Sequence, residues 1–157
     1  MSGSYFLDSN VLIYSFDARA PAKKAAAQAL VEKALAEGVG IISFQVVQEF
    51  FNVATQRFPE PMSAVEATLY LDRVLMPLCR VFPSAELYRS TLALAERWRY
   101  SFFDSLILAA AQAGGCQTLY TEDLQHGQDI EGLRIVNPFN AGAEVATGEP
   151  GSSLSGQ

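Results

Sequence analysis

Short apolar runs alternate with longer helix-like segments along the chain, and this alternation constrains the fold more than any other feature of the sequence. Strand-length apolar runs lie at 5–7, 40–44, 79–82, 118–121 and 133–136. Strands separated by helices form βαβ units with right-handed crossovers and a mostly parallel sheet. The sequence therefore predicts an α/β fold with a central, mostly parallel sheet of about five strands.

The segments between these runs carry the start and stop signals of helices. Pro21 is placed to open a helix, and Gly38 is placed to close it. Ser63 starts another helix, with Glu66 completing the capping-box pattern. The expected helices span 9–16, 21–37, 45–58, 84–100 and 102–113, with one more that starts at Ser63.

The 157 residues suffice for one domain with a sizeable core, since 50% of them are hydrophobic and 18% are charged. We expect a single domain over 1–139. From Asn140 onward the chain consists largely of Gly, Ser, Ala and Pro and lacks large aromatic residues. Residues 140–157 are therefore expected to form a flexible tail.

Composition narrows the classes of function. Acidic residues outnumber basic ones by 17 to 11, and the net charge of −6 disfavours a nucleic-acid binder that works through broad positive charge. Cys79, Cys116 and a single histidine do not suggest a structural zinc site, so any metal is expected to be hard and held by oxygen. The sequence shows neither a membrane-length apolar run nor a secretory signal. We expect a cytoplasmic protein with reduced cysteines and no membrane partner.

Four acidic residues, Asp8, Glu49, Asp104 and Asp123, stand where structural and functional roles compete. Asp8 and Asp123 follow predicted strands, where Asp commonly caps a helix or a turn. Glu49 lies on a polar helix stripe that either faces solvent or lines a groove. Asp104 fits the capping pattern S-x-x-D, yet its helix is apolar almost all round, where a buried carboxylate is costly.

Taken together, the four acids point to one site. The carboxyl ends of parallel strands share one edge of the sheet, and ligands bind in the crevice there. Simple alternation puts the start of the Asp104 helix at the opposite edge, unless the preceding helix first returns along the sheet. Clustered carboxylates need compensating positive charge. Their oxygen ligands select Mg²⁺ or Mn²⁺. Such ions assist the attack of water on phosphodiesters.

Four motif blocks, LDSNVLIY, QEFFNV, FFDSLILAAA and LYTEDLQHG, resemble those of PIN domains in their order and spacing. The closing IVNPF also resembles the end of that domain, so the resemblance covers about 5–139. More narrowly, the chain is similar to the VapC-type toxins of bacterial toxin–antitoxin pairs. Ser9 departs mildly from the family, which more often has Thr after the first Asp.

This resemblance implies a three-layer α/β/α fold and a Mg²⁺- or Mn²⁺-dependent endoribonuclease that acts as a toxin. It assigns catalysis to Asp8, Glu49, Asp104 and Asp123, metal binding to the three aspartates among them, and support to Asn10 and Thr121. It further implies inhibition by a cognate antitoxin, which inserts a segment into a groove near the acids. A homodimer is likewise implied.

Other polar residues have two interpretations. Arg97 and Arg99 are candidate contacts for RNA phosphate, although cations at a helix end also complement the helix dipole. His126 favours a turn or packing role, and Lys23 and Lys24 are expected to be solvated.

The main competing hypothesis is a catalytically silent PIN-like module that binds RNA or an antitoxin, and the intact set of acids argues against it. A phosphoryl-accepting signalling domain normally has adjacent acids after the first strand. A dehalogenase-like phosphatase has a second Asp two residues after the first. Here Ser9 and Asn10 occupy those positions, which disfavours both classes.

Overall fold

A computed structural model describes residues 3–140 and contains one six-stranded sheet. Its strands are β1 (Tyr5–Leu7), β2 (Gly40–Ser43), β3 (Cys79–Val81), β4 (Thr118–Tyr120), β5 (Asp129–Ile130) and β6 (Leu133–Val136). Their order is β3-β2-β1-β4-β6-β5, and only the β5–β6 pair is antiparallel. The predicted α/β fold with a mostly parallel sheet is confirmed.

The sheet has one strand more than the sequence indicated. β5 is only two residues long and turns back onto β6 through Glu131 and Gly132, which both have positive φ angles, 54° and 94°. A run of two residues offers no periodicity from which a strand can be predicted. The predicted tail, apart from Asn140, lies outside the described residues.

Seven α-helices are found within residues 3–140: α1 (Ser9–Tyr14), α2 (Pro21–Glu37), α3 (Phe44–Ala54), α4 (Ala64–Tyr70), α5 (Met76–Leu78), α6 (Ala85–Trp98) and α7 (Phe102–Ala113). A π-helical segment, η1 (Leu71–Leu75), joins α4 to α5 and was not foreseen. The caps predicted at Ser63 and Ser101 are present. α3 ends at Ala54 rather than at Phe58, and the Ala54 carbonyl accepts the Met62 N–H at 2.9 Å instead of an N–H of a continuing helix.

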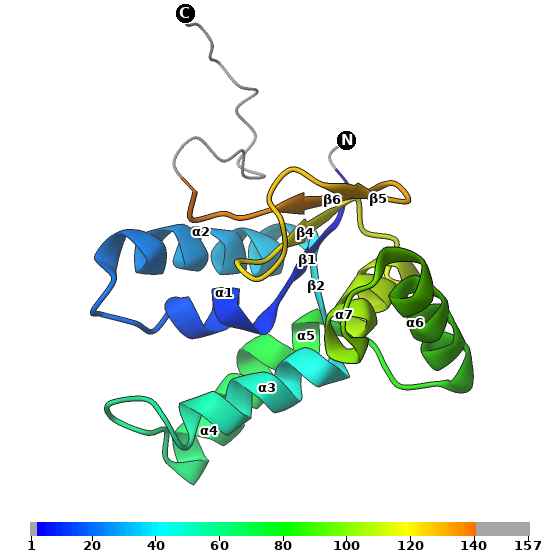
Figure 1. Cartoon of the computed structure of the whole chain (residues 1–157). Helices are drawn as coiled ribbons and strands as arrows, with labels where there is room; N and C mark the ends of the chain where they lie inside the picture. Colours follow the sequence, from blue (N-terminus) through cyan, green and yellow to red (C-terminus); the bar gives the residue numbers. More distant parts are fainter. Residues whose placement is uncertain (1–2, 141–157) are drawn as a thin grey trace, which may run out of the picture.

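The helices flank the sheet in layers, with α1 and α2 on one side of the strands and α6 and α7 on the other (Figure 1). This separation follows from the strand order. The chain passes from β1 to β2 to β3 in one direction and then crosses back to β4, so right-handed crossovers place the two sets of helices on opposite faces. All three residues of β1 are buried as a result.

Close packing of α2 against the sheet requires a glycine at the start of β2. A side chain at Gly40, the first residue of β2, would place its Cβ 2.2 Å from Cβ of Ala34 on α2. Only glycine therefore allows α2 to lie so near the sheet. Within the described part of the chain, none of the helices is both long enough and apolar enough to span a bilayer.

The direction of strand order reverses between β1 and β4. In open α/β sheets this switch point opens a crevice at the carboxyl ends of the strands. β1 and β4 pair in register, with Leu7 opposite Tyr120, and the backbone N–H of Asp8 donates to the Tyr120 carbonyl at 3.1 Å. The residues that follow the two strands therefore leave the sheet side by side.

Candidate active site

Asp8 is the buried centre of the candidate site. It follows β1 and is the N-cap of α1, where one carboxylate oxygen accepts the Ser9 backbone N–H at 2.7 Å. Its other oxygen accepts the Thr121 hydroxyl at 2.8 Å. The capping role expected of Asp8 is therefore present, but the same carboxylate also faces the switch point from a position that is only 6% exposed.

Asn10 and Thr121 connect Asp8 to Asp123. The Asn10 amide lies 3.3 Å from Oγ1 of Thr121 and 3.2 Å from a carboxylate oxygen of Asp123. Oγ1 of Thr121 also accepts the backbone N–H of Asp123 at 3.1 Å. These bonds orient both aspartates, so Asn10 and Thr121 have the positions expected of supporting residues.

Glu49 reaches the site from α3. Its two carboxylate oxygens accept the Ser9 hydroxyl and the Gln45 side-chain amide, each at 2.9 Å. The polar stripe on α3 passes from buried Gln45 to half-buried Glu49 and then to exposed Asn52. The stripe therefore begins in the site and reaches solvent only farther along the helix.

Asp104 lies in the first turn of α7, half buried, and its backbone N–H is capped by the Ser101 hydroxyl at 3.1 Å. Nε2 of Gln45 lies 3.4 Å from the carbonyl oxygen of the preceding residue, Phe103. Since Gln45 also holds Glu49, the start of α7 lies at the same edge of the sheet as α3. The two successive helices α6 and α7 thus provide the returning path that Asp104 requires.

The electrostatics of the site are set mainly by the burial of Asp8, with a smaller contribution from neighbouring like charge. The pKa of Asp8 is raised from 3.8 to about 7, chiefly by burial and also by the neighbouring carboxylates of Glu49 and Asp123, against the lowering effect of its hydrogen bonds. Asp8 therefore ionises less readily than a free carboxyl group unless positive charge is added.

A divalent cation fits this set of donors. The candidate ligands are oxygens, as Mg²⁺ and Mn²⁺ prefer. Among residues 3–140, three buried polar atoms find no hydrogen-bond partner: Oε1 of Gln45, whose amide group holds Glu49, the hydroxyl of Ser105, which follows Asp104, and the hydroxyl of Ser43. In the side-chain positions seen within residues 3–140, no three His, Cys, Asp or Glu residues are close enough to share an ion.

Lys23 was expected to be solvated, but the structure gives it specific partners. Its ammonium group lies 2.7 Å from Oε2 of Glu122 and 3.3 Å from the Tyr14 hydroxyl. Glu122 in turn donates its backbone N–H to Asn10 at 3.3 Å. Sequence reasoning missed this contact because Lys23 and Glu122 are far apart in the chain.

The remaining candidate residues, Arg97, Arg99 and His126, take no part in the hydrogen bonds described above. Arg97 forms an ion pair of 2.9 Å with Glu131 in the β5–β6 turn, and Arg99 is the left-handed C-cap of α6. Their contact with RNA stays a prediction. His126 accepts the backbone N–H of Asn137 through Nδ1 at 3.0 Å, which is the turn role that its sequence context favoured.

Several solved structures share the fold. A toxin–antitoxin complex from Klebsiella pneumoniae aligns with a TM-score of 0.63 and 20% identity, over 88% of this chain and 100% of the other. VapC20 of Mycobacterium tuberculosis, a toxin that cleaves the sarcin–ricin loop, aligns with a TM-score of 0.55 and 22% identity, over 76% and 90%. VapBC2 of Rickettsia felis, bound to promoter DNA, aligns with a TM-score of 0.55 and 18% identity, over 83% and 96%.

Among curated protein sequences, none matches the chain significantly. A family model described as the PIN domain, however, matches residues 5–128. This range includes all four candidate acids and both supporting residues. Since the match extends over most of the sequence, the chain belongs to the PIN domain family.

Proposed function

We propose that this protein is a divalent-metal-dependent endoribonuclease of the VapC type, which acts as the toxin of a toxin–antitoxin pair. One observation carries the proposal: Asp8 is buried at the switch point, and the charges acting on it are the carboxylates of Glu49 and Asp123. A purely structural site would pair such a carboxylate with a cation, because burying it beside like charges is unfavourable.

In this mechanism, Asp8, Asp104 and Asp123 would hold Mg²⁺ or Mn²⁺. When bound, the ion would supply Lewis-acid stabilisation of the negative charge that develops on the phosphate. Glu49 completes the site or orients the attacking water, and Gln45 and Ser9 hold its two oxygens in place. Thr121 and Asn10 fix the directions of the Asp8 and Asp123 carboxylates.

An antitoxin partner and a homodimer are part of the same proposal. The structures from Klebsiella pneumoniae and Rickettsia felis are toxin–antitoxin assemblies, which supports such a partner here. Hollows of about 420 and 580 Å³ lie beside Phe16 and Phe58 at the far end of α1. Their lining mixes apolar side chains with charged ones such as Arg57 and Glu60, which suits an amphipathic antitoxin segment, although they lie farther from the acids than the groove that the resemblance implies.

The proposal is tested by incubating antitoxin-free protein with total cellular RNA and Mg²⁺ or Mn²⁺. We expect discrete fragments with 5′-phosphate ends, which disappear with EDTA and in the Asp8→Asn variant. Val65→Ala, on exposed α4, is a matched control that should cleave normally, because Val65 is 70% exposed and takes no part in the site.

Folded protein that binds the metal ion but leaves all RNA intact would contradict the nuclease assignment. The catalytically silent PIN module would then be the better account. Fragments that persist equally in Asp8→Asn would instead indicate a contaminating ribonuclease.

A further inference from the structure

Three aromatic rings form an exposed surface where α7 begins, and we call Tyr88, Phe102 and Phe103 the ring platform. The Phe102 ring stacks on Tyr88 with centroids 6.4 Å apart and an interplanar angle of 28°. Phe103 meets Phe102 edge to face at 5.3 Å. Phe103 is nevertheless 64% exposed, so its neighbours support the ring and leave most of its surface open.

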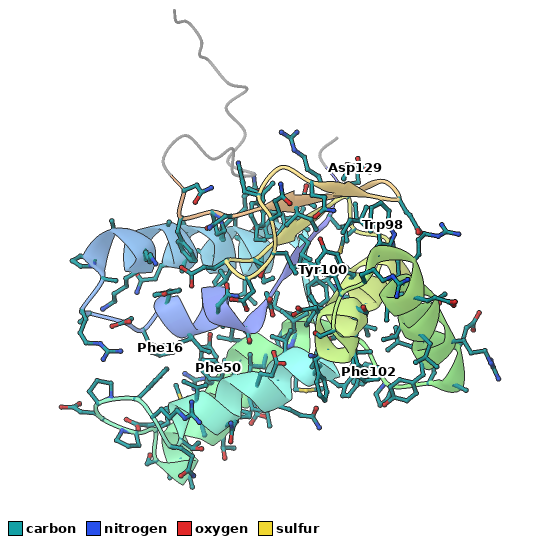
Figure 2. The ribbon with its side chains drawn as sticks, viewed as in Figure 1. Phe16, Phe50, Trp98, Tyr100, Phe102 and Asp129 are labelled. Atoms are coloured by element: carbon teal, nitrogen blue, oxygen red, sulfur yellow. The ribbon has the colours of Figure 1, made fainter. Side chains whose placement is uncertain are left out.

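The platform is attached to the acidic site by both backbone and side-chain contacts. Phe103 directly precedes Asp104, and its carbonyl oxygen lies 3.4 Å from the same Gln45 amide that holds Glu49. Figure 2 shows Phe102 at the end of α7 that meets the start of α3. Any ligand that spans the acids and extends toward α7 therefore encounters these rings first.

Protein folding alone does not account for this surface. Scattered apolar side chains are common on protein surfaces, but contiguous exposed rings usually mark a binding surface. Exposed Leu92 lies one turn after Tyr88 on α6, but the side chains that lie nearest to Asp104 in sequence, Phe102 and Phe103, are aromatic, which suits a flat partner.

We propose that the ring platform stacks the bases of single-stranded RNA next to the phosphodiester held at the acids, with Phe103 as the central ring. This inference rests on the proposed function and adds the subsite that holds the flanking nucleotides.

Charge explains why stacking is needed there. The protein carries a net charge of −6, and its carboxylate cluster repels the phosphates on either side of the one that a metal ion would neutralise. Stacking of bases on aromatic rings does not depend on protein charge and tolerates any base, because every base has a flat face. The platform therefore provides affinity for RNA that does not depend on lysine or arginine.

The test measures binding without cleavage, using fluorescence anisotropy of a short labelled single-stranded RNA on the Glu49→Gln protein in Mg²⁺, because this variant keeps the three proposed metal ligands. Phe103→Leu keeps apolar bulk but removes the ring, Phe103→Tyr keeps the ring, and Val65→Ala is the surface control. We expect Phe103→Leu to weaken binding about tenfold, with Phe103→Tyr and Val65→Ala unchanged. An RNA that lacks bases beside the central phosphate should bind the parent protein about tenfold more weakly and lose nothing further in Phe103→Leu.

Unchanged RNA affinity in Phe103→Leu would overturn the inference. So would equal binding of the base-free and intact RNAs. If the platform instead joins two copies of this chain, Phe103→Leu will bind RNA normally while Phe103→Ala sediments as a smaller species. If wild-type protein binds RNA through Phe103 but does not cut it, the nuclease proposal fails while the stacking inference stands.

Discussion

The two ends of α1 differ sharply in chemistry, although the helix spans only Ser9–Tyr14. At its start, Asp8 is buried among other carboxylates and relies on hydrogen bonds alone. Just beyond its end, Phe16 lies against Phe50, Phe58 and Tyr70, with ring centroids 5.2 to 5.8 Å from its own. The aromatic end at Phe16 stabilises the fold through buried apolar area. The acidic end at Asp8 destabilises the fold unless positive charge is added.

This contrast implies that the two ends can be changed independently. Substitutions at the aromatic end should lower the free energy of unfolding and leave the chemistry of folded molecules intact. Substitutions at the acidic end should impair the chemistry of folded molecules without lowering the free energy of unfolding.

The largest expected effect is at the aromatic end. Phe50 is fully buried and stacks on Tyr70 with centroids 4.9 Å apart, so Phe50→Ala should lower the free energy of unfolding by about 3–5 kcal/mol. Urea denaturation measures the loss. RNA cleavage per folded molecule should stay within about twofold of wild type, and a loss comparable to that of Asp8→Asn would contradict the separation of the two ends.

At the acidic end, Asp8→Asn should reduce RNA cleavage by at least about 100-fold, because it removes a proposed metal ligand. The same change should leave the metal-free protein as stable as wild type at pH 8, or more stable by ~1–2 kcal/mol, since it removes a buried charge. Single-turnover cleavage and urea denaturation together check both effects. Low activity that simply follows loss of folded protein would show that Asp8 is structural.

Thr121→Val should weaken metal binding by about 10–100-fold, because the hydroxyl that orients Asp8 is lost while the buried volume is kept. Isothermal titration with Mn²⁺ measures this affinity. As a matched control, Thr91→Val removes another fully buried hydroxyl, one that donates to the Leu87 carbonyl within α6, and should leave metal affinity unchanged.

The stability of the metal-free protein should fall as pH rises from about 4 to about 7. The folded pKa of Asp8 is about 7 and its ordinary value is 3.8, so between these limits the folded state binds the extra proton and is favoured by acid. Urea denaturation across this range should show a shallower slope in Asp8→Asn. An identical slope in both proteins would mean that Asp8 is not the titrating group.

The smallest effect is expected at Lys23, which is partly exposed and bonded to Glu122. Lys23→Met should reduce Mn²⁺ affinity by less than about tenfold, because it loosens the segment that carries Asp123 without removing a ligand. Lys24→Met is the matched control and should bind Mn²⁺ as wild type does.

Most of the fold was predictable, because its signals are local. Alternating apolar runs locate the strands, and caps such as Ser63 and Ser101 locate helix starts. The two-residue β5 and the π-helical η1 have no such signal, since one is too short for periodicity and the other depends on packing along α4 and α5.

Sequence motifs named the candidate site residues, whose functional roles stay predictions, but they gave few of the contacts between them. Motif order identified Asp8 and Asp123, and the switch point brings them together. The role of Gln45 as the link between Glu49 and α7, and that of Lys23 as the partner of Glu122, depend on contacts between distant segments. A single sequence contains no direct signal for such pairs.

The central claim is that the like-charged acids form a divalent-metal site, and thermal unfolding at pH 8 with and without Mn²⁺ tests it most directly. An ion that binds only the folded state stabilises it by about 2.7 kcal/mol at 100 times its Kd. We predict that Mn²⁺ raises the Tm of wild-type protein by several degrees and leaves that of Asp8→Asn unchanged. A wild-type Tm that does not respond to millimolar Mn²⁺, or an equal rise in both proteins, would contradict the claim.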